Sequence, residues 1–82
     1  MFIKYNSNIH NLNNYFSIVK TDKTKILLTK ESGNYQALDF IDTFTRDKVI
    51  NNIWDEMQKG TEFLDIDDYA LMCKEAEVYN IA

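Results

Sequence analysis

The chain has 82 residues, a single cysteine, no proline and a formal net charge of −4. This length allows one domain, residues 1–82, and a single cysteine excludes an internal disulfide. We predict a cytoplasmic protein, because the sequence opens with no basic-then-apolar leader and has no apolar run near the ~20 residues of a membrane span.

Four segments have the composition and the alternation of β-strands: residues 2–5, 15–21, 25–30 and 35–41. Short turns join the last three, which favours an antiparallel meander. The segment between the first two is polar and rich in asparagine, and we predict that it is a loop. The predicted fold class is therefore α+β, with a four-stranded antiparallel sheet packed against two helices.

Alternation divides the side chains of this predicted sheet between two faces. The face expected to pack on a helix holds Phe16, Ile18, Ile26, Leu28, Leu38 and Phe40. The other face holds Tyr15, Ser17, Val19, Leu27, Thr29, Tyr35, Ala37 and Asp39. An antiparallel sheet can leave one face to solvent, so this second face is available to a partner.

The first predicted helix spans residues 45–59. Its apolar side chains recur at helical spacing and are expected to be buried: Val49, Ile50, Ile53, Trp54 and Met57. We predict that Thr45 is the N-cap and that Gly60 ends the helix in the left-handed conformation.

A second helix is predicted over residues 67–79, because apolar side chains again recur at helical spacing. They are Tyr69, Met72, Cys73, Ala76 and Tyr79. Asp65 or Asp67 is expected to cap this helix, since acids are favoured at a helix N-terminus.

Residues that could carry catalysis are few. His10 and Cys73 are the sole histidine and the sole cysteine, so a zinc site would need added carboxylates as ligands. A catalytic Cys–His pair would need a third group to orient it, and the sequence suggests none. An acidic run begins at Asp65, but a calcium-binding EF-hand loop would need glycine and glutamate where Ala70 and Ala76 stand. Two glycines are too few for a phosphate-binding loop. We therefore predict no enzyme activity, no metal and no cofactor.

The charge is divided unevenly along the chain. Residues 1–38 carry a net charge of +3 and residues 39–82 carry −7. Four lysines lie on the predicted hairpin, near two tyrosines: Lys20, Lys23, Lys25 and Lys30. Such a surface can bind single-stranded nucleic acid, although an acidic chain favours edge protection or a protein contact instead. A further alternative is that the acidic half imitates nucleic acid.

The N-terminal half also carries a pattern of residues that occurs in one known family. The pattern comprises Phe2-Ile3-Lys4-Tyr5, Ser7, His10, Leu12, Asn13 or Asn14, Tyr15 and Ile18, followed by Lys25-Ile26, Glu31, Asp39-Phe40 and Asp42. With these residues about half of the chain resembles small phage anti-CRISPR proteins that bind the backbone subunits of a type I Cascade-like surveillance complex.

This resemblance implies a four-stranded antiparallel sheet on two antiparallel helices, and an inhibitor that acts in the host cytoplasm. The sheet side would dock on the crRNA-bearing backbone and block pairing with target DNA, without catalysis or a cofactor. Implied contact residues are Tyr5 and Glu31, whereas Lys20 stands where the family has a second contact tyrosine.

The predicted partner-binding residues are Tyr5, Tyr15, Lys20, Glu31 and Tyr35. Aromatic and charged anchors of this kind carry most of the binding energy in protein interfaces. The alternative to an inhibitor is a structural or regulatory module that self-associates through the same sheet face.

Overall fold

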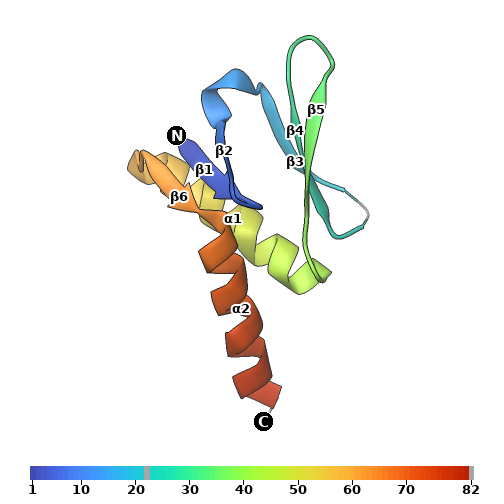
Figure 1. Ribbon diagram of the computed structural model, residues 1–82, viewed down its shortest axis with the longest axis vertical. Helices are drawn as coiled ribbons and strands as arrows, with labels where there is room; N and C mark the ends of the chain where they lie inside the picture. The colour runs from blue at the N-terminus through green and yellow to red at the C-terminus, as the bar shows by residue number, and fades with distance from the viewer. Residues whose placement is uncertain (22, 82) are drawn as a thin grey trace.

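The computed structural model describes residues 1–21 and 23–81, with side chains as far as Cys73. The elements in chain order are β1 (Phe2–Tyr5), β2 (Asn8–Asn11), the 3-10 helix η1 (Leu12–Asn14), β3 (Ser17–Lys20), β4 (Lys25–Thr29), β5 (Tyr35–Asp39), α1 (Thr43–Lys59), β6 (Phe63–Asp65) and α2 (Ile66–Ile81) (Figure 1). The fold class is α+β, as predicted.

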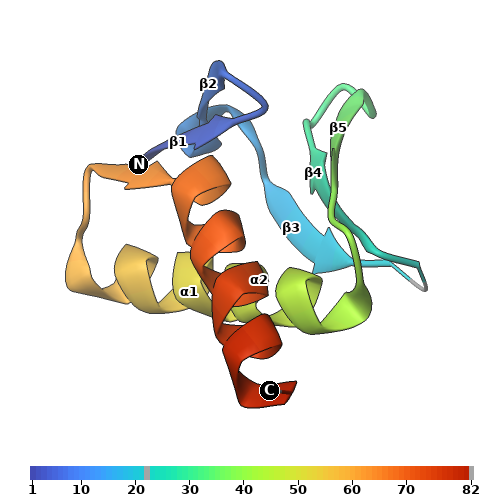
Figure 2. The ribbon, with the colours of Figure 1, turned by 60° about the horizontal axis from the view of Figure 1, so that its bottom comes forward.

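The strands form two three-stranded sheets, so the prediction of one four-stranded sheet is wrong. Sheet A has the strand order β2-β1-β6, and sheet B has the order β3-β4-β5. The four predicted strands are all present, but β1 pairs with β2 and β6 and does not join the meander. Figure 2 shows the two sheets standing apart above α1.

Sheet A depends on a tight turn between β1 and β2. Asn6 and Ser7 both have positive φ values, 51° and 63°, which suit a two-residue hairpin turn. The Asp67 carboxylate accepts hydrogen bonds from both turn amides, at 2.6 Å from Asn6 N and 3.0 Å from Ser7 N. Part of the segment predicted to be a loop is thus strand β2, which pairs with β1, and Asp67 at the start of α2 fixes the turn between these strands.

Sheet B has the predicted meander and the predicted division between its faces. Ile26 pairs with Leu38, and both are fully buried together with Leu28, facing α1. The prediction is wrong for the two residues before β3, where the alternation of the strand does not yet apply. Phe16, expected on the inner face, is 65% exposed, and Tyr15, expected on the outer face, is half-buried and packs against the core.

Helix α1 starts two residues earlier than predicted. Asp42 is the N-cap and accepts a hydrogen bond from Thr45 N at 2.7 Å, so the prediction of Thr45 as the cap is wrong. Gly60 has φ of 78° and ends the helix in the left-handed conformation, which confirms that prediction.

The buried stripe of α1 has the predicted spacing but lies one turn closer to the N-terminus. Its buried residues are Thr45, Arg46, Val49, Ile50 and Ile53. Trp54 and Met57, predicted to be buried, are 42% and 47% exposed. A stripe of five residues covers about two turns, and the core contacts are at the first turns of α1 rather than at the last.

Helix α2 begins one residue before the predicted start. Asp65 Oδ1 accepts a hydrogen bond from Asp68 N at 2.9 Å, which confirms one of the two predicted caps. Tyr69 packs against the core, whereas Met72 is 57% exposed. The expected burial of Ala76 and Tyr79 lies outside the described side chains.

One apolar core joins both sheets and both helices. Its buried members are Ile3, Leu12, Ile26, Leu28, Leu38, Val49, Ile50, Ile53 and Ile66. Helix α2 crosses over α1 and approaches β1 (Figure 2). Over the described residues, neither helix has the length and apolar character to cross a bilayer.

Candidate protein-binding surface

The face of sheet B that points away from α1 is open over the described part of the chain. We call it the outer face; its members are Ser17, Val19, Lys25, Leu27, Thr29, Tyr35, Ala37 and Asp39. Val19, Leu27 and Ala37 are paired across the three strands and form an apolar row, and Val19 is 45% exposed. Tyr35 is 68% exposed. The predicted open face is therefore present, with an apolar centre and an aromatic anchor.

A shallow hollow of about 360 Å³ lies on this outer face. It is lined by Thr21, Lys23, Lys25, Leu27, Tyr35 and Ala37. Neither Lys23 nor Lys25 has an ion pair among the described residues, and both are exposed. The hollow thus combines an apolar floor with two available ammonium groups.

A second hollow, of about 430 Å³, lies at the end of sheet B where the turn between β4 and β5 projects. We call this region the hairpin end. Tyr15, Lys30 and Glu31 line the hollow, and the Lys30 ammonium lies 5.6 Å from the centre of the Tyr15 ring. The structure therefore brings together two of the five predicted binding residues, Tyr15 and Glu31. Tyr35 begins β5 at the same end of the sheet but lines the hollow on the outer face.

Lys20 does not lie with this group. It is on β3 opposite Ile26, at the other end of the sheet, and its Nζ is 3.5 Å from Asp47 Oδ1 on α1. The Asp47 carboxylate also accepts a hydrogen bond from Arg46, and this bond is the main reason that the pKa of Asp47 is lowered. Desolvation opposes the shift, and the charge of Lys20 adds to it. Lys20 thus joins β3 to α1.

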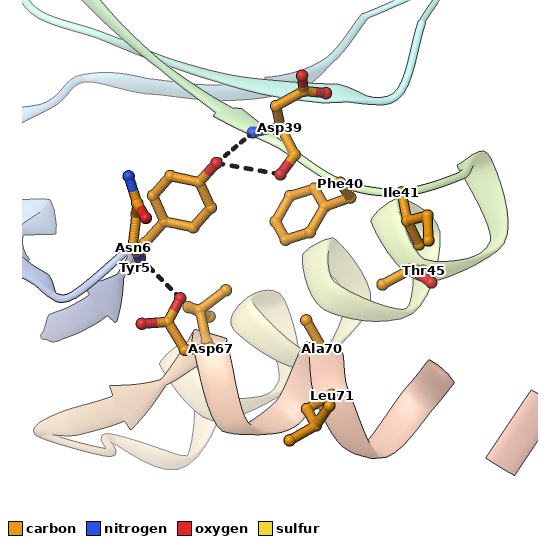
Figure 3. Close-up of a pocket in the computed structure, with 10 residues that line it drawn as sticks. Tyr5, Asn6, Asp39, Phe40, Ile41, Thr45, Asp67, Ala70 and Leu71 are labelled. Atoms are coloured by element: carbon orange, nitrogen blue, oxygen red, sulfur yellow. Dashed lines mark hydrogen bonds between the residues drawn. The ribbon is translucent and has the colours of Figure 1, made fainter. Parts of the chain in front are cut away.

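Tyr5 also lies away from the hairpin end, between the two sheets. Its hydroxyl donates to the carbonyl oxygen of Asp39 at 3.0 Å and accepts from the Asp39 backbone amide at 2.8 Å (Figure 3). The Tyr5 ring packs edge-on against Phe40, with 5.9 Å between ring centres. The structure therefore gives this tyrosine an internal role that the sequence did not reveal.

The cavity in Figure 3, about 360 Å³ in volume, lies between the ends of β1 and β5 and the two helices. Phe40, Thr45, Ile66 and Ala70 supply much of its wall. Thr45 Oγ1 is buried and has no hydrogen-bond partner among the described residues. Tyr5, Asp39 and Asp67 also line the cavity. No group of three His, Cys, Asp or Glu side chains that could hold a metal occurs among the described residues.

Sheet A carries an exposed aromatic pair that the sequence did not predict. Phe2 on β1 is paired with Phe63 on the parallel strand β6, and they are 46% and 49% exposed. They line a hollow of about 670 Å³ together with Met57 from α1. Without knowledge of β6, no feature of the sequence placed these two rings side by side.

Comparison of the chain with protein-family models, with curated proteins and with solved structures gives no match. The candidate site is consequently defined by its own geometry.

Proposed function

We propose that this chain is a non-catalytic inhibitor that docks on a larger protein assembly through the outer face and the hairpin end of sheet B. The observation that carries the proposal is the open three-stranded face, with its apolar row and the exposed Tyr35 ring. Interface centres are rich in aromatic residues, and tyrosine is a frequent hot spot.

The proposed target is the crRNA-bearing backbone of a type I CRISPR surveillance complex. This target rests on the residues shared with anti-CRISPR proteins, Glu31 among them, which lies exposed at the hairpin end. The resemblance implied a single four-stranded sheet, whereas the chain has two three-stranded sheets. The architecture therefore does not support this target.

The test uses a purified type I surveillance complex and labelled target DNA. Excess wild-type protein should prevent the complex from binding DNA in a gel-shift assay. Tyr35→Ala and Glu31→Ala should each weaken inhibition, by roughly 30-fold if the residue is a hot spot worth about 2 kcal/mol. Phe2→Ala is the matched control, because it removes an exposed aromatic ring from sheet A instead.

Unchanged DNA binding in the presence of saturating wild-type protein would refute the CRISPR target. Equal losses in Tyr35→Ala and Phe2→Ala would refute the outer face as the contact. Variants at Tyr5 are unsuited to this assay, because its hydroxyl joins the sheets and a loss of binding would not separate contact from folding.

A second candidate function is the binding of single-stranded nucleic acid at the hollow on the outer face. The observation that favours it is that the exposed Tyr35 ring lines the same hollow as Lys23 and Lys25. Aromatic rings stack on bases and lysines neutralise phosphates. A labelled oligothymidine should then bind with an affinity that falls steeply as salt rises. Absence of binding at low salt would exclude this function.

A further inference from the structure

Strand β5 forms one edge of sheet B, and half of its backbone groups point away from the sheet. Phe40 N donates to the Thr24 carbonyl at 3.0 Å, and Lys30 N donates to the Asn34 carbonyl at 2.8 Å. In an antiparallel pair the bonded positions alternate. The amides and carbonyls of Tyr35, Ala37 and Asp39 therefore face outward.

Among the described residues, Asp39 is the one outward position whose amide and carbonyl are both bonded by the chain itself. The Tyr5 hydroxyl bonds its amide and its carbonyl, as a neighbouring strand would. Figure 3 shows this contact between Tyr5 and Asp39. The open part of the edge is therefore limited to Tyr35 and Ala37.

The outward amides of Tyr35 and Ala37 have no hydrogen-bond partner among the described residues. The Ala37 carbonyl receives only the Gln36 side-chain amide, at 3.3 Å. Edge strands are usually protected by lysine, proline or a bulge. Strand β5 reads Tyr-Gln-Ala-Leu-Asp and has no lysine or proline, and its register with β4 is continuous.

We propose that this edge binds β5 of a second copy of the chain in an antiparallel, two-fold arrangement. The register that uses only the open positions places Tyr35 opposite Ala37 of the second copy, with the two Gln36 residues facing each other. Both open positions then exchange backbone hydrogen bonds, which gives four bonds around the two-fold axis.

The side chains in this register are compatible. Tyr35, a large ring, lies beside the small Ala37 side chain on the outer face. Asp39, whose backbone groups Tyr5 already binds, makes no pair in this register. Opposite it the second copy has its β4–β5 turn, where Gly33 N bonds the Lys30 carbonyl of its own chain. No two like charges are opposed, which would otherwise destabilise the pair.

Pairing would also enlarge the proposed docking surface. Three strands of four or five residues give a face of roughly 14 by 17 Å. This is small beside the roughly 800 Å² that each partner contributes to a standard interface. Two copies form one continuous six-stranded sheet and double that face. The pairing itself buries little surface, so we expect a weak dimer.

The test requires only the purified chain, so its outcome is independent of the CRISPR assay. Sedimentation velocity from about 10 µM to about 1 mM spans the range expected for a small, transient interface. Amide hydrogen exchange at both ends of this range reports on individual residues. The amides of Tyr35 and Ala37 should exchange rapidly when dilute and become protected when concentrated.

Ala37→Pro removes an outward amide without removing a bond to β4, a position at which an edge strand tolerates proline. This variant should stay monomeric, whereas the control Ala37→Val keeps the amide and should dimerise. A wild-type chain that is monomeric throughout, or a dimer in which Tyr35 and Ala37 stay unprotected, would overturn the proposal. Because exchange is measured on the wild type, the result holds even if the proline variant fails to fold.

Discussion

The hydroxyl of Tyr5 should stabilise the fold rather than bind a partner. Tyr5→Phe keeps the ring against Phe40 and removes only the oxygen that bonds the Asp39 amide and carbonyl. Each hydrogen bond contributes about 0.5–1.5 kcal/mol net, and Asp39 is exposed enough for water to replace part of the loss. We expect a decrease of about 1–2 kcal/mol in the free energy of unfolding.

For a chain of this size, 1 kcal/mol corresponds to about 4–8 °C in the melting temperature. The decrease is measurable by urea denaturation and by thermal unfolding followed by circular dichroism. Tyr35→Phe is the matched control, because the Tyr35 hydroxyl has no partner among the described residues and the ring is 68% exposed. Equal stability of Tyr5→Phe and Tyr35→Phe would refute the argument that Tyr5 joins the two sheets.

Three further predictions concern stability. Arg46 is buried, and its guanidinium donates to the carbonyls of Thr21 and Lys23, so Arg46→Met should cost about 3 kcal/mol in urea denaturation. Ser7 has φ of 63°, so Ser7→Gly should raise the unfolding free energy by about 0.5–1 kcal/mol, and an unchanged urea midpoint would contradict this. Hydrogen bonds from Arg46 to Asp47 and from Thr61 to Glu56 lower the pKa of each carboxyl below 3.8 and 4.5 respectively. As the pH falls below these values the unfolded state takes up protons first, so stability should decline in this acid range. The double variant Asp47→Asn, Glu56→Gln should lose less melting temperature than the wild type as the pH falls through this range. An equal loss in the two proteins would refute the assignment to these carboxyl groups.

Local patterns in the sequence predicted the pairing of sheet B, the C-terminal end of α1 and one cap of α2, but not the N-cap of α1. The alternation over β4 and β5 placed Ile26, Leu28 and Leu38 on the buried face, because short turns fix the register between neighbouring strands. Gly60 ends α1 as expected, since its positive φ favours glycine.

Sheet A depends on contacts that no local pattern contains. Strand β2 reads Asn-Ile-His-Asn, with little intrinsic preference for a strand, and it is held by its pairing with β1. Strand β6 has only three residues and pairs with a strand about sixty positions earlier. The sequence therefore could not show that β1 leaves the meander, nor that Phe2 and Phe63 lie side by side.

The candidate site was predictable in part. Tyr35 was placed on the open face by alternation, and the structure gathers Tyr15 and Glu31 near the same end. Lys20 was selected for its charge and Tyr5 for its aromatic ring, and both for the resemblance. None of these criteria indicates which residues a side chain contacts in the folded protein. Their bonds to Asp47 and Asp39 are long-range and become visible only in the folded chain.

The parallel pairing of β1 with β6 bears on the order in which the protein is assembled. Phe2 N donates to the Glu62 carbonyl at 2.7 Å, so β1 needs residues that are synthesised about sixty positions later. Sheet B and α1 have contacts between neighbouring segments and can form earlier during synthesis. During that interval Phe2 and Ile3 lack their pairing with β6 and stay exposed, so a ribosome-bound chaperone could bind them.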